Sequence, residues 1–238
     1  MAYWGTILCV LDELFVVWCM DRVKGLPVFI LAIPVRLFKH GNEDTMAKRI
    51  VFVHGSPRKN GNTRAVTALA MEAARQQGAD VAEIDATTLK FKVAGCLGCQ
   101  KCQQSDAFAC VLGDQLADTV AILPEYDVIV LSTPLYWWSF TAQLKIFIDR
   151  MYCLSKFGED DGVLSVLSGK KLAIIATAGG PMEDNLELLE SQWRNPAQMV
   201  GCSFDSCLFP DTVVPAGELV NDLAAAEKAR SFGRRLAS

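Results

Sequence analysis

Short apolar runs alternate with amphipathic stretches from residue 49 to the end of the chain. The apolar runs have the length and β-branched content of buried strands, and they lie at residues 50–54, 81–84, 127–133, 171–177 and 203–209. Amphipathic patterns predict helices over about 66–78, 114–123, 141–152, 183–199 with a disturbance at Pro196, and 219–236. Strands of this kind, alternating with helices, form parallel sheets covered on both faces. The sequence therefore predicts an α/β domain whose ligands bind beyond the carboxyl ends of its strands.

Composition and charge exclude some classes of protein. The chain has 238 residues, of which 51% are hydrophobic and 21% charged, as in an ordinary globular protein. A net charge of -4 leaves no excess of Lys and Arg to neutralise a phosphate backbone, so no nucleic-acid partner is expected. Four of the nine cysteines crowd into one segment, unlike a secreted disulfide framework, which favours a cytoplasmic location. The scattered Cys153, Cys202 and Cys207 are expected to be small buried hydrophobes.

Residues 1–45 differ from the rest because they are aromatic and apolar without a clear helical or strand period. Charges at 12–13 and prolines at 27 and 34 interrupt their apolar runs, which fall short of the ~18 uninterrupted residues of a membrane span. No basic segment precedes the first run, as one would in a signal peptide. We expect an N-terminal extension outside the native fold, without stable membrane insertion, and a domain over 46–238. A weak membrane or partner anchor is the alternative.

The segment GSPRKNGNT, residues 55–63, follows the first predicted strand and leads into a helix. Backbone N–H groups and the helix dipole favour an anion at such a place. Short polar side chains, an arginine fork and a glycine suit a phosphate there, and they are Ser56, Arg58, Asn60, Gly61, Asn62 and Thr63. No Lys follows Gly61, so the loop is not a Walker A motif and favours a phosphomonoester. The alternative is a turn that merely caps the helix.

Three adjacent aromatic residues follow the most strongly predicted strand, in the segment TPLYWWS. They cannot all face the core, so we expect Tyr136, Trp137 and Trp138 to offer ring faces to a flat ligand. The alternative is that they fill a helix-sheet interface or a subunit contact.

The segments GSPRKNGNT, PLYWWSFTAQLKIFIDR and ATAGG, with the amphipathic C-terminal helix, resemble the NADPH-dependent FMN reductase family of the flavodoxin-like superfamily. The resemblance covers residues 46–238 and implies a three-layer sandwich, with a five-stranded parallel sheet in the order 2-1-3-4-5 and FMN at its carboxyl edge. The FMN phosphate would then be held by Ser56, Arg58, Asn60, Asn62 and Thr63. The isoalloxazine would lie against Pro134, Leu135, Tyr136, Trp137 and Trp138, and its polar edge against Ala178, Gly179 and Gly180. The resemblance also implies a homodimer or homotetramer.

Cys96, Cys99 and Cys102 are spaced CxxCxxC, and Cys110 follows. Four thiolates at such spacing can ligate a [4Fe-4S] cluster, and within the family this segment resembles the iron-sulfur flavoproteins. Reduced thiols in a loop over the flavin are an equally strong reading. Zinc is a third, although zinc ligands more often come as two separated pairs.

The leading hypothesis for function is an FMN-dependent oxidoreductase that passes electrons from NAD(P)H to a small acceptor such as a quinone or free flavin. The flavin carries the chemistry, so no catalytic side chain is predicted. One alternative is an electron carrier that uses FMN and a cluster between protein partners. Another is a flavin-free redox or metal sensor built on the cysteine loop.

Overall fold

The computed structural model describes residues 7–11, 14–20, 27–34, 47–158 and 162–238. The chain divides into two compact units, Met1–Met46 and Ala47–Ser238. Each is described here by itself.

The first unit contains a three-stranded antiparallel sheet in the order β1-β2-β3. Its strands are β1 (Ile7–Leu11), β2 (Leu14–Met20) and β3 (Pro27–Pro34). Sequence reasoning finds no strand period in this segment, yet its Val, Ile, Phe and Trp content is typical of strands. The two prolines stand at the first and last residues of the edge strand, where a missing N–H costs the sheet little.

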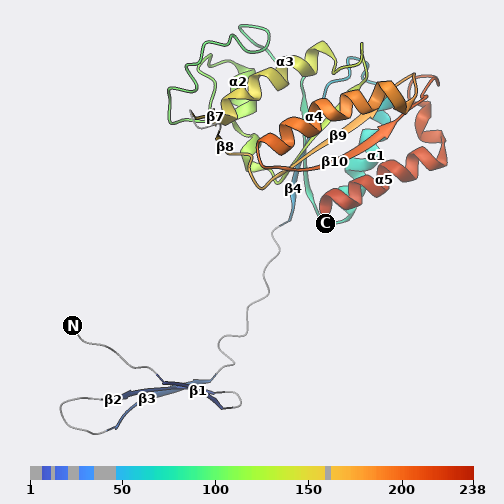
Figure 1. Cartoon of the computed structure of the whole chain (residues 1–238). Coiled ribbons are helices and arrows are strands. Elements are labelled where there is room, and N and C mark those ends of the chain that lie inside the picture. Colours follow the sequence, from blue (N-terminus) through green and yellow to red (C-terminus); the bar gives the residue numbers. More distant parts are fainter. Residues whose placement is uncertain (1–6, 12–13, 21–26, 35–46, 159–161) are drawn as a thin grey trace. The chain divides into compact units, whose positions relative to one another are not determined.

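The second unit is built on a five-stranded parallel sheet, visible in Figure 1. Its strands are β4 (Arg49–His54), β5 (Asp80–Asp85), β6 (Val128–Pro134), β9 (Lys171–Thr177) and β10 (Ser203–Phe209). They are arranged in the order β10-β9-β6-β4-β5. Counted along the chain within this sheet, that order is 2-1-3-4-5, so the predicted doubly wound topology is confirmed.

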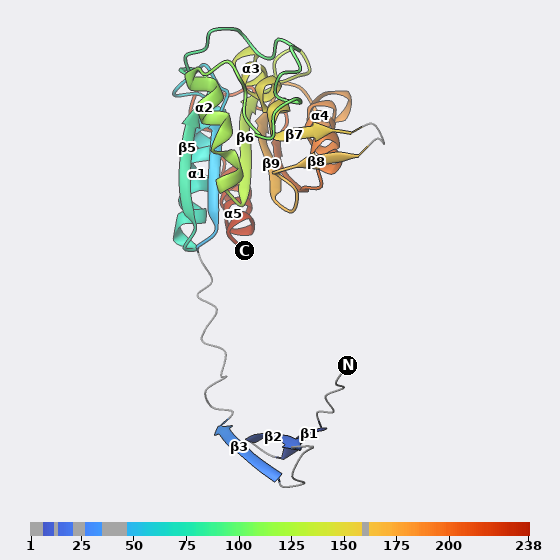
Figure 2. The same cartoon turned by 90° about the vertical axis from the view of Figure 1, so that its left-hand side faces the viewer.

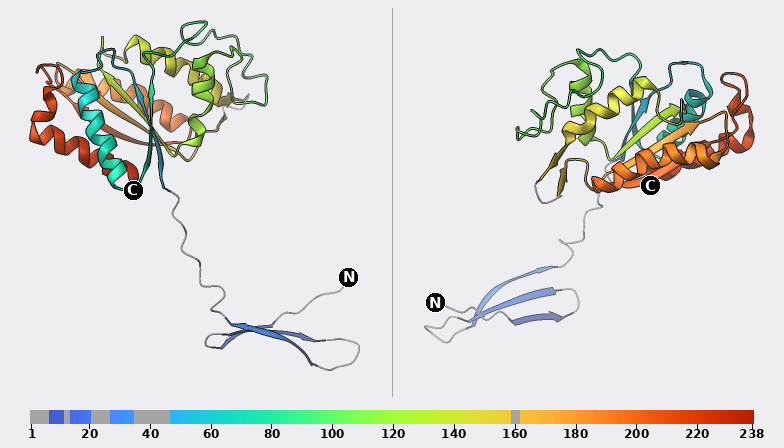
Figure 3. Two further views of the ribbon diagram at one scale, coloured as in Figure 1. Left: turned by 180° about the vertical axis from the view of Figure 1, so that it is seen from behind. Right: turned by 45° about the horizontal axis from the view of Figure 1, so that its top comes forward.

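Helices cover both faces of the parallel sheet. Helices α1 (Asn62–Gln76) and α5 (Leu223–Ala237) pack together on one face, as Figure 3 shows from behind. Their backbones approach so closely that a Cβ atom on Gly233 would lie 2.0 Å from the carbonyl oxygen of Ala70. The other face carries α2 (Gln115–Ala121), α3 (Ala142–Arg150) and α4 (Glu187–Met199).

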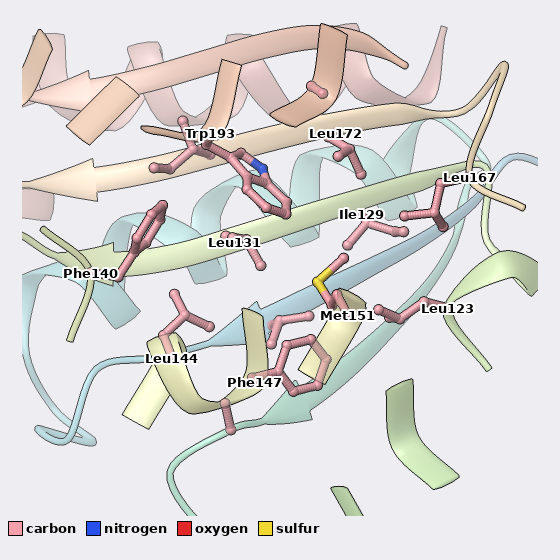
Figure 4. Close-up of a cluster of buried hydrophobic side chains, with 14 of the residues drawn as sticks. Leu123, Ile129, Leu131, Phe140, Leu144, Phe147, Met151, Leu167, Leu172 and Trp193 are labelled. Atoms are coloured by element: carbon pink, nitrogen blue, oxygen red, sulfur yellow. The ribbon is translucent and has the colours of Figure 1, made fainter. Parts of the chain in front are cut away.

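The larger apolar core lies between the sheet and this second set of helices. Figure 4 shows Leu144 and Phe147 of α3, together with Trp193 of α4, gathered around Ile129 and Leu131 of β6. Strand β5 is partly exposed because it lies at the edge of the sheet, whereas β9 is buried because it lies between β6 and β10. The sheet thereby holds the ends of β4, β6 and β9 at one edge, where the ligand site is expected.

Two predicted helices need adjustment. Helix α4 begins at Glu187 rather than at residue 183, because the preceding π turn Met182–Leu186 contains two residues with non-helical backbone angles. Pro196 lies inside α4 without ending it. Helix α5 begins at Leu223, where the Asp222 carboxylate accepts hydrogen bonds from two backbone N–H groups.

Several short elements were not predicted. A hairpin formed by β7 (Ser155–Phe157) and β8 (Val163–Ser165) lies after α3, as Figure 2 shows. Three single turns of 3-10 helix also occur, at Leu123–Glu125, Met151–Leu154 and Glu218–Asn221. Within the described ranges, no helix is both long and apolar enough to span a membrane.

We propose that residues 1–45 are dispensable for the flavodoxin-like unit, since every motif used above lies after Met46. A chain that starts at Met46 should fold and bind flavin like the full chain. Flavin titration and a thermal melt of both forms check this. Aggregation, or weaker flavin binding by the shorter chain alone, would show that the extension belongs to the fold.

Candidate functional site at the carboxyl edge of the sheet

The loops after β4, β6 and β9 enclose a cavity of about 200 Å³ with the segment that follows β10. Most of the predicted site residues line it, namely Ser56, Arg58, Gly61, Asn62, Thr63, Pro134, Leu135, Tyr136, Ala178 and Gly179. The other four predicted residues, Asn60, Trp137, Trp138 and Gly180, are not part of its lining. The two loops singled out from the sequence therefore meet at one cavity.

The loop after β4 folds tightly around its own backbone. The carbonyl oxygen of Arg58 accepts hydrogen bonds from the Gly61 N–H, at 3.1 Å, and from the Ser56 hydroxyl, at 3.3 Å. Gly55 is required at the start of the loop, because a Cβ there would lie 2.6 Å from the Cβ of Leu144. Ser56 is buried, whereas Arg58 is exposed at the edge of the cavity.

The start of α1 faces this cavity without a side-chain cap. Its N-cap residue is Gly61, no side chain caps the helix, and its first turn carries no acidic residue. The first N–H groups of a helix have no partner within the helix, and they favour an anion. The 15 residues of α1 add the helix dipole to that preference.

Buried hydroxyl groups connect the loops to one another. The Thr63 hydroxyl on α1 lies 2.6 Å from the Thr177 hydroxyl at the end of β9. Thr67 and Ser132 join α1 to β6 in the same way, at 2.7 Å. The Thr141 hydroxyl, at the start of α3, donates to the carbonyl oxygen of Gly55 at 2.7 Å. These bonds fix the positions of the loops before any ligand binds.

Sequence reasoning missed four residues of the lining, one at the end of β9 and three in the segment after β10. The missed residues are Thr177, Thr212, Val214 and Ala216. Thr177 could have been found, since it ends a predicted strand beside Ala178. The 212–216 segment is brought in by Asn62, whose amide donates to the Val214 carbonyl and accepts from the Leu219 N–H, both at 3.1 Å. Nothing in the local sequence signals that contact.

The aromatic residues after β6 form a strained two-residue turn. Tyr136 and Ser139 exchange both backbone hydrogen bonds, at 3.0 and 3.1 Å, with Trp137 and Trp138 between them. Both tryptophans have positive φ, 49° and 56°, in a conformation that usually takes Gly or Asn. The Trp138 indole N–H donates to the Asp184 carbonyl, whereas the Trp137 side chain is 89% exposed.

A cluster of charged side chains lies on the α1 face of the sheet, behind the loop. His54 Nε2 lies 3.2 Å from a Glu83 carboxylate oxygen, and Arg64 pairs with Asp85 at 2.6 Å. Burial, and secondarily the charge of Arg64, lower the pKa of His54 from 6.5, so its imidazole is neutral near pH 7. Burial opposes ionisation of Asp85, but hydrogen bonds from Thr87 and Arg64 outweigh it and lower the pKa of that carboxyl.

The four clustered cysteines line a second, smaller cavity of about 20 Å³, together with Arg150 and Cys153. Cys96 and Cys99 are exposed, whereas Cys102 is buried. Arg150 is buried and holds the loop: it donates to the carbonyls of residues 93 and 95, pairs with Asp114 at 3.0 Å, and lies 3.5 Å from the Cys110 sulfur.

The cysteine cavity offers four thiols as ligands to a metal. Among the residues that the structure describes, no three Cys, His, Asp or Glu side chains are placed to hold a single ion, which does not support the zinc reading. A cubane cluster differs, because each of its four thiolates binds a different iron. The set of four thiols therefore suits a cluster by its chemistry, whereas the space between them, about 20 Å³, is that of about one water molecule.

The three scattered cysteines are buried, as predicted. Burial raises the pKa of the Cys153 and Cys207 thiols to about 12 and that of Cys202 to about 11. They are protonated at neutral pH, and their role is packing.

Comparison with known proteins assigns the family. The model of the family described as NADPH-dependent FMN reductase matches residues 48–198. The chain belongs to this family. It is accordingly a flavodoxin-like oxidoreductase that uses FMN, and the predicted family is confirmed.

The relatives include iron-sulfur flavoproteins from three organisms. One from Methanocaldococcus jannaschii is 26% identical over 79% of this chain and 95% of its own length. That from Methanosarcina thermophila is 29% identical over 64% of this chain and 75% of its own. The one from Archaeoglobus fulgidus is 32% identical over 43% of this chain, and the match spans 45% of that relative's length.

Solved structures of similar fold include an NAD(P)H:quinone oxidoreductase from Methanothermobacter marburgensis, with a TM-score of 0.62 and 20% identity over 80% of this chain and 99% of that one. An FMN-dependent NADH-azoreductase from Bacillus anthracis, solved with FMN, gives a TM-score of 0.59 and 12% identity over 80% of this chain and 100% of that one. At these identities they confirm the flavodoxin-like fold.

The strained turn generates a prediction. Trp137→Asn should raise the free energy of unfolding by about 1 kcal/mol, because Asn adopts positive φ more readily and the exposed indole contributes little burial. Flavin binding should weaken at the same time, if the turn serves the site. Chemical denaturation and flavin titration measure the two effects. A variant that is less stable than the wild type would contradict the presence of strain at residue 137.

Proposed function

We propose that the chain binds FMN in the cavity at the carboxyl edge of the sheet and passes electrons from NAD(P)H to a small acceptor such as a quinone or free flavin. The observation that carries this proposal is that an uncapped helix N-terminus and an aromatic turn border the same cavity. The first suits a phosphate and the second a flat ring.

The phosphate end is assigned to the loop after β4. The N–H groups at the start of α1, the buried Ser56 hydroxyl and the Arg58 guanidinium converge there, and all carry donors. Thr63 and Asn62 already bond to Thr177 and to the 214–219 backbone, so their side chains chiefly fix the shape of the site. Asn60 and Gly61 form the turn that lets the backbone approach the ligand.

The ring end is assigned to the loops after β6 and β9. Pro134, Leu135 and Tyr136 provide an apolar wall, and the backbone of residues 178–180 can meet the polar edge of the ring. Trp137 and Trp138 would lie at the outer margin of the ring, where they limit access of water.

When bound, FMN supplies the ring that takes electrons from a nicotinamide cofactor and gives them to an acceptor. The chain's own residues bind the flavin and orient it. The buried hydroxyl groups hold the loops, and Tyr136 lines one side of the cavity.

A titration of the full chain with FMN tests this function. Arg58→Ala should weaken FMN binding about ten- to a hundredfold, since a charge-assisted hydrogen bond contributes roughly 1.5 to 3 kcal/mol. Lys59→Ala is the matched control, because Lys59 is exposed, carries the same charge and does not line the cavity. NAD(P)H oxidation with a quinone should require FMN. Equal losses in both variants, or oxidation without flavin, would contradict the proposal.

The finer features of this function are also proposals. A small quinone or flavin as acceptor agrees with the names of the similar structures. A homodimer or homotetramer agrees with the exposed apolar side chains around the cysteine loop and α4, among them Leu97, Val111 and Met199. A cytoplasmic location agrees with the clustered, unpaired cysteines.

A second candidate function is that of an iron-sulfur flavoprotein that carries electrons between protein partners. Its specific support is that all four clustered cysteines line one cavity under a buried arginine, and that several relatives bear this name. Cys96, Cys99, Cys102 and Cys110 would each ligate one iron, and the cluster would supply a second one-electron centre.

Metal analysis of anaerobically purified protein decides between the two readings of the cysteine loop. With a cluster, the protein should contain about four irons per chain and lose them in Cys110→Ser. Cys207→Ala, which removes a thiol buried on the opposite face of the sheet, should keep the iron. Iron-free wild-type protein whose NAD(P)H oxidation survives Cys110→Ser would favour reduced thiols.

A further inference from the structure

The charged cluster behind the loop is not explained by the proposed function. Four of its side chains come from three elements: His54 from β4, Glu83 and Asp85 from β5, and Arg64 from α1. None of them lines the cavity at the carboxyl edge. The cluster nevertheless adjoins the loop, because His54 immediately precedes Gly55 and Ser56.

Arg64 joins this cluster to the loop. Its Nη2 atom donates to the Asp85 carboxylate at 2.6 Å and to the carbonyl oxygen of Ser56 at 3.4 Å. Asp85 is itself fixed, since its other carboxylate oxygen accepts from the Thr87 N–H at 3.0 Å and from the Thr87 hydroxyl at 2.6 Å. The guanidinium is therefore held on β5 while one of its nitrogen atoms supports the loop backbone.

Support of the Ser56 carbonyl by Arg64 affects the shape of the loop after β4. Ser56 is 3% exposed, and its hydroxyl donates to the Arg58 carbonyl that also closes the turn at Gly61. A shift of the Ser56 peptide would move both the hydroxyl and the start of α1, the two groups assigned to the phosphate. Errors of an ångström in such groups reduce binding and catalysis strongly.

The cluster does not have the features of an ion-pair network selected for stability alone. In the described part of the chain, two buried side-chain nitrogens bond to no protein group, and both belong to it: His54 Nδ1 and Arg64 Nε. Buried polar atoms without partners, here the unprotonated His54 Nδ1 and the Arg64 Nε–H, cost free energy, and native proteins retain few of them. Their concentration directly behind one loop indicates that the arrangement serves the loop.

We propose that Arg64 is a positioning residue for the phosphate of the bound flavin. It acts through the Ser56 carbonyl, from a site anchored by Asp85, and does not touch the ligand. This inference rests on the proposed binding of FMN to the loop after β4. Arg64 lies outside the cavity, and its removal should affect only the phosphate end of the site.

Comparison of FMN with riboflavin tests this role, since riboflavin has the same ring but no phosphate. In Arg64→Gln, the Kd for FMN should rise roughly tenfold, because the Ser56 peptide loses its support and the groups that bind the phosphate shift. The Kd for riboflavin should stay within about twofold of the wild-type value, because the ring end of the site is unchanged. Quenching of flavin fluorescence in the full chain measures both constants.

Arg75→Gln is the matched control. Arg75 lies on the same helix and pairs with Glu83 of the same strand at 3.3 Å, but about three turns away from the loop. It should leave both constants unchanged. Should Arg64→Gln not fold, Asp85→Asn gives the same test, because it keeps Arg64 and removes its anchor; it should also weaken FMN selectively.

Three results are distinguishable. A selective loss of FMN affinity supports the inference. Wild-type affinities for both flavins in folded Arg64→Gln, or equal losses of both, would overturn it, since the second result indicates a merely structural role. A wild-type chain that binds FMN no more tightly than riboflavin would instead refute the phosphate site itself, and with it the proposed function.

Discussion

Hydrogen bonds made by buried hydroxyl groups hold the carboxyl edge of the sheet together. Thr63 to Thr177, Thr67 to Ser132 and Thr141 to Gly55 connect two helices to strands β6 and β9 and to the loop after β4. Each such bond contributes only about 1 kcal/mol net, but breaking one leaves a buried hydroxyl unpaired at a cost of about 1 to 3 kcal/mol. The loops therefore have one favoured arrangement around the cavity.

Several energetically unfavourable features of the described chain lie near the candidate site. The first turn of α1 has no side-chain cap, two tryptophans occupy positive φ, and the unpartnered nitrogens of His54 and Arg64 lie behind the loop. Local departures of this kind persist only where the surrounding structure enforces them, and they concentrate at functional sites. Their common location, at the ends of β4 and β6, agrees with the place where parallel sheets bind ligands.

Sequence patterns predicted those strands and loops of the site whose structure depends on neighbouring residues in the chain. The apolar runs of β4, β6 and β9 and the anion loop follow from residue type and spacing, and the structure brings the two predicted loops to one cavity. The parts that were missed depend on distant contacts. Nothing near Val214 indicates that Asn62 binds it, and nothing near Arg64 indicates a bond to Ser56. In residues 1–46, strands form without the alternation that sequence reasoning requires.

We propose that FMN binds at the carboxyl edge with its phosphate in the loop after β4. Backbone amide chemical shifts of the full chain, followed by NMR during titration with FMN, test this most directly because they locate the ligand. The largest changes should fall on residues 56–63, with further changes at residues 134–138 and 178–180. Changes confined to the cysteine loop, residues 96–110, or shifts that leave residues 56–63 unaffected, would contradict the account.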